Sequence, residues 1–150
     1  MAFDPQLIEA QMKLGTIHPE EMPALAWDAL EAGFDGPCIR RVAAMIRPSG
    51  WEVDQQMPGF MGEAGLKNIP LEEASIRVAR QLASRILSER RDPLEYSKDF
   101  ELIWIQSNYA KAIQDVGSLD DQKAVGLQTE AKLREYARSL LLELLDNPLP

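Results

Sequence analysis

Prolines and glycines divide the sequence into short stretches with helical periodicity, and this division constrains the fold more than any other feature. Ten prolines and nine glycines interrupt the 150 residues. Several prolines stand where a helix would begin, as in Asp4-Pro5, Gly36-Pro37 and Asp92-Pro93. Proline suits the first position of a helix because its missing N–H would have no partner there. Between these boundaries apolar residues recur three and four positions apart, so the sequence predicts an all-α fold without a β-sheet.

The boundaries predict a compact single-domain bundle of about six or seven helices covering residues 1–150. A chain of this length buries a sizeable core without disulfides or metals. The clearest helix begins at Pro70 and ends near Arg91, with an apolar face opposite a polar one. Residues 115–128 are the least determined part, and we expect a less ordered connection there, with a short helix capped by Ser118 as the alternative.

The stretch from Ser49 to Leu66 could be a ligand-binding loop or a helix. Ser49 and Glu52 have the spacing of a capping box, which begins a helix, and Gly65 is a typical helix end. Its apolar residues share one helical face: Val53, Met57, Phe60, Met61 and Ala64. Its glycines would suit a phosphate loop, but no Lys-Ser or Lys-Thr pair follows them. We therefore predict a helix that is kinked or broken near Pro58, since an interior proline costs about 3 kcal/mol.

Charge is distributed unevenly along the chain, whose formal net charge is −8. Residues 1–75 contain 12 acidic and 5 basic side chains, whereas residues 76–150 contain 12 and 11. The first half would repel phosphate backbones, so we do not expect nucleic acid as a partner. A protein with a basic surface fits this half better, although many soluble proteins are acidic without such a partner.

The apolar runs are too short to predict a membrane-spanning helix. The N-terminal residues carry an acid where a secretion signal would carry Lys or Arg. A single cysteine, Cys38, has no partner for an internal disulfide. Together these features predict a cytoplasmic protein that does not contact a membrane.

We expect no catalytic, metal-binding or cofactor-binding residues and therefore a non-enzymatic protein. The only histidine, His18, stands beside Glu20 and Glu21 at a helix start, and capping accounts for it better than metal ligation. With one cysteine and one histidine, the only Cys–His dyad possible is Cys38 with His18. A half-buried, inert thiol is the favoured interpretation of Cys38.

The candidate interaction residues lie in the predicted 50–65 helix and on the polar face of the 70–91 helix: Trp51, Met57, Phe60, Met61, Arg77 and Arg80. Methionine adapts its shape to a partner, and the arginines could bind an acidic group, although a solvated face is the simpler interpretation. Elsewhere, Trp27 and Trp104, like Trp51, stand in apolar patterns that predict core positions. Ile46 is expected in the buried stripe of the helix that begins at Pro37.

Across residues 10–105 the order of these features resembles that of small, all-helical bacterial proteins of uncharacterised function. The likeness rests on a Gly-x-Ile…Glu-Glu-x-Pro start at residues 15–23, a Leu-Glu-Ala-Gly-x-Asp-x-Pro run at residues 30–37, and a Trp-Glu…Phe…Gly-Leu pattern at residues 51–66. A long Ala/Arg helix that ends at Asp92-Pro93 follows. The resemblance implies a compact helical fold and supplies no activity to carry over to this chain, and Pro58-Gly59 departs from its pattern.

Three hypotheses about function follow. The first is a small acidic protein-interaction module of the immunity, antitoxin or adaptor kind, whose partner is another protein. The second is a small-molecule-binding protein or enzyme whose pocket lies near residues 51–66, with Arg77 and Arg80 at its rim. The third is a structural homodimer formed through the C-terminal helix between Leu133 and Leu145, whose leucine stripe is unusually broad.

Overall fold

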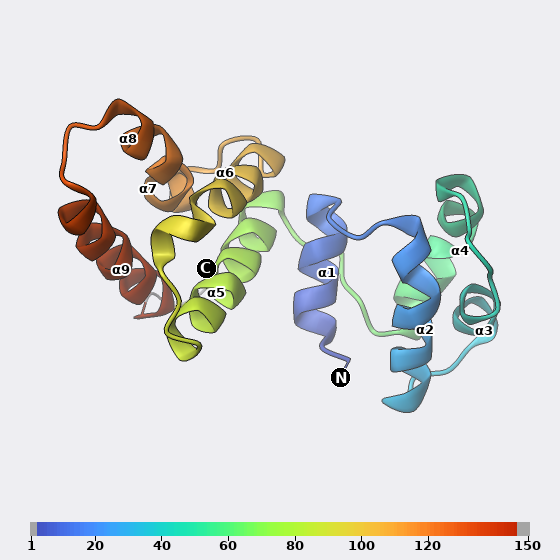
Figure 1. Ribbon diagram of the computed structural model, residues 1–150. Coiled ribbons are helices and arrows are strands. Elements are labelled where there is room, and N and C mark those ends of the chain that lie inside the picture. The colour runs from blue at the N-terminus through green and yellow to red at the C-terminus, as the bar shows by residue number, and fades with distance from the viewer. Residues whose placement is uncertain (1–2, 147–150) are drawn as a thin grey trace. The chain divides into compact units, whose positions relative to one another are not determined.

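The computed structural model describes residues 3–146, and within this range the chain is built of helices and connecting turns without a β-strand (Figure 1). The predicted all-α class is confirmed. The helices exceed the predicted six or seven because residues 114–125 form two short ones.

The chain divides into two compact units, residues 1–69 and residues 70–150. A single domain covering the whole chain stays a prediction.

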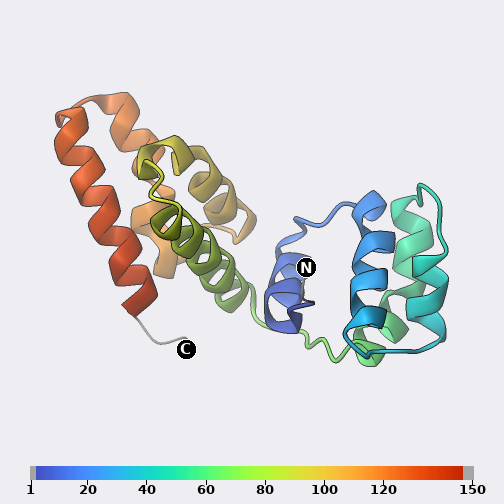
Figure 2. The same ribbon diagram turned by 60° about the horizontal axis from the view of Figure 1, so that its bottom comes forward.

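The first unit contains α1 (Pro5–Leu14), α2 (Met22–Glu31), α3 (Pro37–Ala43) and α4 (Gly50–Glu63), with a 3-10 turn at Pro19–Glu21 before α2. The expected cap begins α1, because the Asp4 carboxylate accepts hydrogen bonds from the N–H groups of Gln6 at 3.2 Å and Leu7 at 3.4 Å. Gly15 ends this helix in the left-handed conformation, with a φ of 74°. In Figure 2, α3 and α4 run side by side, in agreement with their close contacts.

One apolar core holds the first unit together. Its members come from α1 to α4 and from the residues flanking α1 and α4: Phe3, Ile8, Met22, Ala26, Ala29, Ile39, Val42, Ala43, Val53, Phe60, Ala64 and Leu66. Phe60 and Ile39 are completely buried. Burial of side chains of this size contributes about 1.5–3 kcal/mol each.

Residues 50–63 form one helix that continues through Pro58. Both hydrogen bonds of the predicted capping box are present, with the Glu52 N–H donating to the Ser49 hydroxyl at 3.2 Å and the Ser49 N–H donating to the Glu52 carboxylate at 3.4 Å. The helical alternative for this stretch is therefore confirmed, and the helix is not broken. Because proline has no N–H, α4 lacks one backbone hydrogen bond at Pro58. The Pro58 ring is exposed and therefore does not disturb the core.

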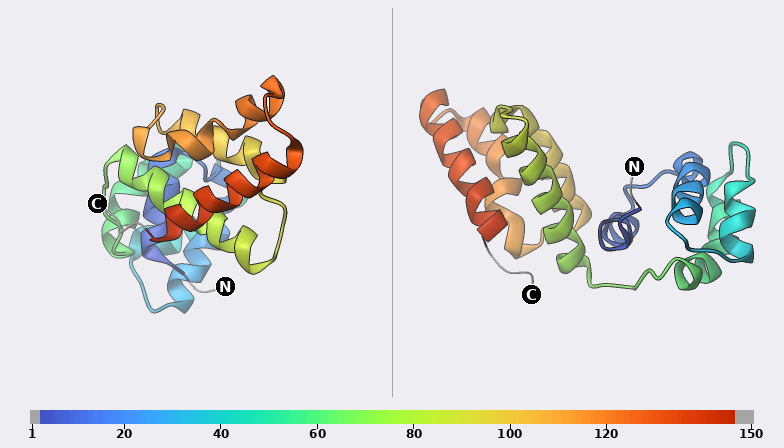
Figure 3. Two further views of the ribbon diagram at one scale, coloured as in Figure 1. Left: turned by 90° about the vertical axis from the view of Figure 1, so that its left-hand side faces the viewer. Right: turned by 90° about the horizontal axis from the view of Figure 1, so that it is seen from below.

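The second unit contains α5 (Leu71–Ser88), α6 (Ser97–Gln106), α7 (Gln114–Gly117), α8 (Leu119–Val125) and α9 (Glu130–Asp146), with 3-10 turns at Pro93–Tyr96 and Lys111–Ile113. α5 packs against α6 and α9, and α6 against α7 and α8. The left view of Figure 3 shows α9 crossing α5 at an angle.

The expected weakly ordered connection at residues 115–128 is mostly helical. α7 and α8 occupy all but Ser118 and residues 126–128. The Ser118 side chain does not cap α8; its hydroxyl donates to the Asp115 carbonyl at 3.2 Å instead. α7 packs closely against α6 at Gly117. Only glycine fits there, because a Cβ at this position would lie 2.5 Å from side-chain atoms of Trp104.

The core positions predicted for three apolar side chains are wrong. Trp27 is 57% exposed, Trp51 is 71% exposed and Ile46 is 88% exposed. α2 buries Met22, Ala26 and Ala29, which lie on one face and leave Trp27 beside it. Ile46 lies outside because α3 ends at Ala43 and the periodicity no longer applies. Trp104, in contrast, is partly buried in the second unit.

No helix within residues 3–146 is both long enough and apolar enough to cross a membrane.

Candidate functional site

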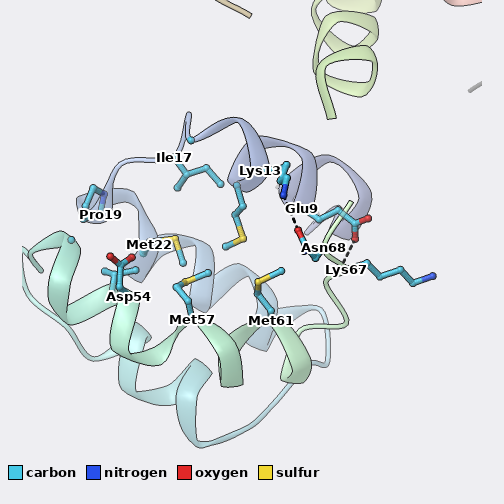
Figure 4. Close-up of a pocket in the computed structure, with 14 residues that line it drawn as sticks. Glu9, Lys13, Ile17, Pro19, Met22, Asp54, Met57, Met61, Lys67 and Asn68 are labelled. Atoms are coloured by element: carbon cyan, nitrogen blue, oxygen red, sulfur yellow. Dashed lines mark hydrogen bonds between the residues drawn. The ribbon is translucent and has the colours of Figure 1, made fainter. Parts of the chain in front are cut away.

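The first unit contains a pocket of about 390 Å³ between α1, the turn before α2, and α4 (Figure 4). The lining side chains come from these elements and from the segment that follows α4: Glu9, Met12, Lys13, Gly15, Ile17, Pro19, Met22, Gly50, Val53, Asp54, Met57, Met61, Lys67 and Asn68. The pocket is open to solvent along one side. Its volume is in the range typical of ligand-binding sites.

Four of the chain's six methionines line this pocket: Met12, Met22, Met57 and Met61. Met57 and Met61 are four residues apart in α4, so both side chains project from the same face of the helix. Met22 begins α2 and is 3% exposed, whereas the other three are partly exposed. Unbranched thioether side chains adapt to the shape of whatever packs on them. The centre of the pocket is therefore an adaptable apolar surface.

At one end of the pocket the polar groups are hydrogen-bonded to each other. The Lys13 ammonium donates to the Asn68 side-chain carbonyl at 3.1 Å. The Glu9 carboxylate accepts the Lys67 N–H at 3.2 Å, and Glu9 is 5% exposed. These bonds attach the segment after α4 to α1 and so fix that wall of the pocket (Figure 4).

The opposite end is formed by Pro19, Gly50 and Asp54, and Figure 4 shows Pro19 and Asp54 there with the methionines between the two ends. Local sequence features set the ends of the helices that form the pocket. Gly15 ends α1, Pro19 starts the turn before α2, and the Ser49 capping box sets the first residue of α4.

The structure brings together two of the six predicted interaction residues. Met57 and Met61 line the pocket. Phe60 is completely buried in the core, and the exposed Trp51 does not line the pocket. The apolar face predicted for residues 53–64 is wide. Phe60 on this face packs in the core, whereas Met57 and Met61 line the pocket.

Arg77 and Arg80 belong to the second unit and do not line the pocket. The Arg77 guanidinium forms an ion pair with Glu73 at 2.6 Å, and Arg80 donates to the Leu145 carbonyl at 3.1 Å. Both are partly buried, and these bonds make them part of the internal hydrogen bonding of α5 and α9. That they form the rim of a pocket with residues 51–66 stays a prediction.

Met12, Met22, Glu9 and Asn68 were not predicted from the sequence as site residues. Met12 and Met22 lie in helices that share no sequence pattern with residues 50–65. Lys13 and Asn68, which are hydrogen-bonded to each other, lie 55 positions apart in the sequence. Five of the six methionines fall within residues 12–61, and this clustering is the one signal that could have indicated the pocket.

The environment of Cys38 differs from that of an activated nucleophile. Glu63 and Arg41 are the charged groups at its thiol. Burial, followed by the hydrogen bond to Glu63 and its charge, raises the pKa of the Cys38 thiol above its usual value, and Arg41 offsets part of this effect. A raised thiol pKa agrees with the inert cysteine favoured from the sequence.

Among residues 3–146, no three His, Cys, Asp or Glu side chains converge on a common point as metal ligands would. Comparison of the chain with models of protein families, with curated proteins and with solved structures finds no match. The resemblance to small helical bacterial proteins therefore stays a prediction.

Proposed function

We propose that the protein is a small acidic interaction module whose first unit binds an apolar segment of a partner protein in the methionine-lined pocket. The observation that carries this proposal is the convergence of Met12, Met22, Met57 and Met61 from three helices on one solvent-open cavity. Methionine-rich surfaces are typical of sites that bind apolar side chains of different shapes.

The polar groups around the pocket support binding rather than bond-making chemistry. Glu9 and Lys13 are engaged with Lys67 and Asn68, where they hold the wall in place. The cavity of about 390 Å³ has room for a large apolar side chain of a partner. Such an anchor, buried in a pocket and surrounded by a polar rim, supplies most of the binding energy of many protein interfaces.

A small apolar molecule is the second candidate ligand, because the volume of the pocket also lies in the range of small-ligand sites. The third hypothesis, a homodimer through the C-terminal helix, has weaker support. α9 buries Leu133, Ala137, Leu140 and Leu141 inside the second unit, and of its remaining leucines Leu142 is the exposed one.

The test uses the full-length chain with ¹³C-labelled methionine methyl groups, assigned by single Met→Leu substitutions. Peptides are first selected from a displayed library of random sequences and then titrated into the labelled protein. We expect bound peptides to shift the signals of Met12, Met57 and Met61 and to leave that of Met45 unchanged. Met45 is the matched control because it packs against the core but does not line the pocket.

A Met57→Trp variant, which fills the pocket, should lower the affinity of the selected peptides at least tenfold, whereas Met45→Leu should not change it. Circular dichroism checks that both variants are folded. Selected peptides that leave the pocket methyl signals unshifted would contradict the proposal. Decanoate is titrated in parallel, and binding of decanoate at these methyl groups without binding of any peptide would favour the second candidate.

A further inference from the structure

We infer that the bound segment carries a basic residue, preferably arginine, beside its apolar anchor, and that Asp54 is the residue that pairs with it. This inference rests on the proposed function, because it assigns the chemistry of the segment that occupies the same pocket.

The two ends of the pocket differ in their polar groups. At the Lys13 end, Lys13 is bonded to Asn68 and Glu9 to the Lys67 N–H, and Figure 4 shows the Lys67 side chain extending away from the methionines. Asp54 at the other end is exposed, and within residues 3–146 no hydrogen bond or ion pair engages its side chain. An unpaired carboxylate beside an apolar cavity is available to a partner's cation.

The Asp54 carboxylate has two oxygens that can accept hydrogen bonds. The N–H donors of arginine lie in one plane and can bind both oxygens at once, whereas lysine presents a single compact charge. Arginine is therefore the better partner for Asp54.

The surrounding charge has the same sign. Glu20 and Glu21 directly follow Pro19, which lines this end of the pocket, and both are exposed. The first unit as a whole has ten acidic and five basic side chains. A negative potential at this end favours a cationic residue over an anionic one and increases the rate of association.

The test compares peptides that share one apolar anchor, taken from the library selection, and that differ only at the flanking residue: Arg, Lys, Gln or Glu. We expect affinity for the full-length chain to fall in that order. Asp54→Asn should weaken the Arg peptide about fivefold, as for an ion pair at a partly exposed site, and leave the Gln peptide unchanged. Glu31→Gln, the control, removes one exposed charge from α2 outside the pocket and should change neither peptide.

The Asp54→Asn variant also tests the preference for arginine. It removes the carboxylate that can bind two arginine N–H groups at once, so the affinities of the Arg and Lys peptides should become more similar. Methyl signals of Met57 and Met61 report in every case whether the peptide occupies the pocket.

The two proposals fail in different ways. Peptides that shift the pocket methyl signals but bind equally with Arg, Gln or Glu, or equally to Asp54→Asn, would overturn the inference and leave the proposed function intact. The absence of any peptide that uses the pocket would overturn both.

Discussion

Gly59 shows at the scale of one residue why an apparently unfavourable residue stands in the middle of α4. A Cβ at position 59 would overlap the Cys38 sulfur and lie 3.3 Å from the Cys38 Cβ, so Cys38 of α3 occupies the space that a side chain at position 59 would need. Gly62 is in the same helix, but a Cβ there would meet no atom within 4 Å. The two glycines therefore have opposite consequences for packing.

We predict that Gly59→Ala lowers the free energy of unfolding by about 1–3 kcal/mol, because it overpacks the contact with Cys38. Gly62→Ala, the matched control, should raise it by up to about 1 kcal/mol through helix propensity. Urea denaturation measures both. In a Cys38→Ala background the cost of Gly59→Ala should be smaller, and equal costs in both backgrounds would show that Cys38 is not the cause.

At the scale of elements, Glu63 links α4 to the beginning of α3. The residue at the N-cap of α3 is Gly36, which has no side chain to accept the first N–H groups. The Glu63 carboxylate accepts them instead, from Ile39 at 2.9 Å and Cys38 at 3.2 Å. A Cβ at position 36 would overlap this carboxyl group, so Gly36 leaves the space that Glu63 occupies.

These bonds determine the pKa of Glu63. Burial acts to raise it, but the N–H groups of Ile39 and Cys38, with smaller contributions from the Cys38 side chain and Arg41, hold the pKa below its ordinary value. A carboxyl group whose pKa is lower in the folded than in the unfolded chain stabilises the fold above its unfolded pKa. This stabilisation is lost as the pH falls through the lowered folded value.

We therefore predict that Glu63→Gln lowers the Tm at pH 7 and that the difference from the unsubstituted chain closes as the pH falls below about 4, where glutamate becomes protonated. Thermal unfolding followed by circular dichroism across this range measures it. Glu31→Gln, at an exposed position of α2, should change the Tm little at either pH. A difference for Glu63→Gln that persists undiminished in acid would mean that the charge is not responsible.

At the scale of the whole molecule, the division at residue 69 is the feature with the clearest experimental consequence. All members of the apolar core around Phe60 lie between Phe3 and Leu66, and so do all residues that line the methionine pocket except Lys67 and Asn68. The first unit thus contains a core and its candidate site within residues 1–69.

We predict that residues 1–69 and residues 70–150, produced separately, each fold into helical structure with a cooperative thermal transition. The first fragment should have a modest stability, because a chain of this size buries a small core. Circular dichroism and calorimetry on both fragments and on the complete chain make the comparison. Fragments that are unfolded while the complete chain is folded would instead support the single domain predicted from the sequence.

The predictions that held depend on neighbouring residues. Asp4, Pro5 and Gly15 delimit α1, and Ser49 with Glu52 begins α4, because caps are hydrogen bonds between groups a few positions apart. The predictions that failed depend on distant parts of the chain. Trp27 and Trp51 are exposed because the helices that pack against α2 and α4 cover other faces of them.

The sequence by itself determined that this chain is all-helical and where most of its helices begin and end, since backbone capping and apolar periodicity are local. Only the tertiary structure decided that four methionines from three helices share one pocket, that Glu63 caps a helix whose first residue lies 26 positions earlier, and that Gly59 stands at a helix contact. These contacts depend on how helices that are separated by loops pack against each other. Small changes in the angle between two helices decide which side chains meet.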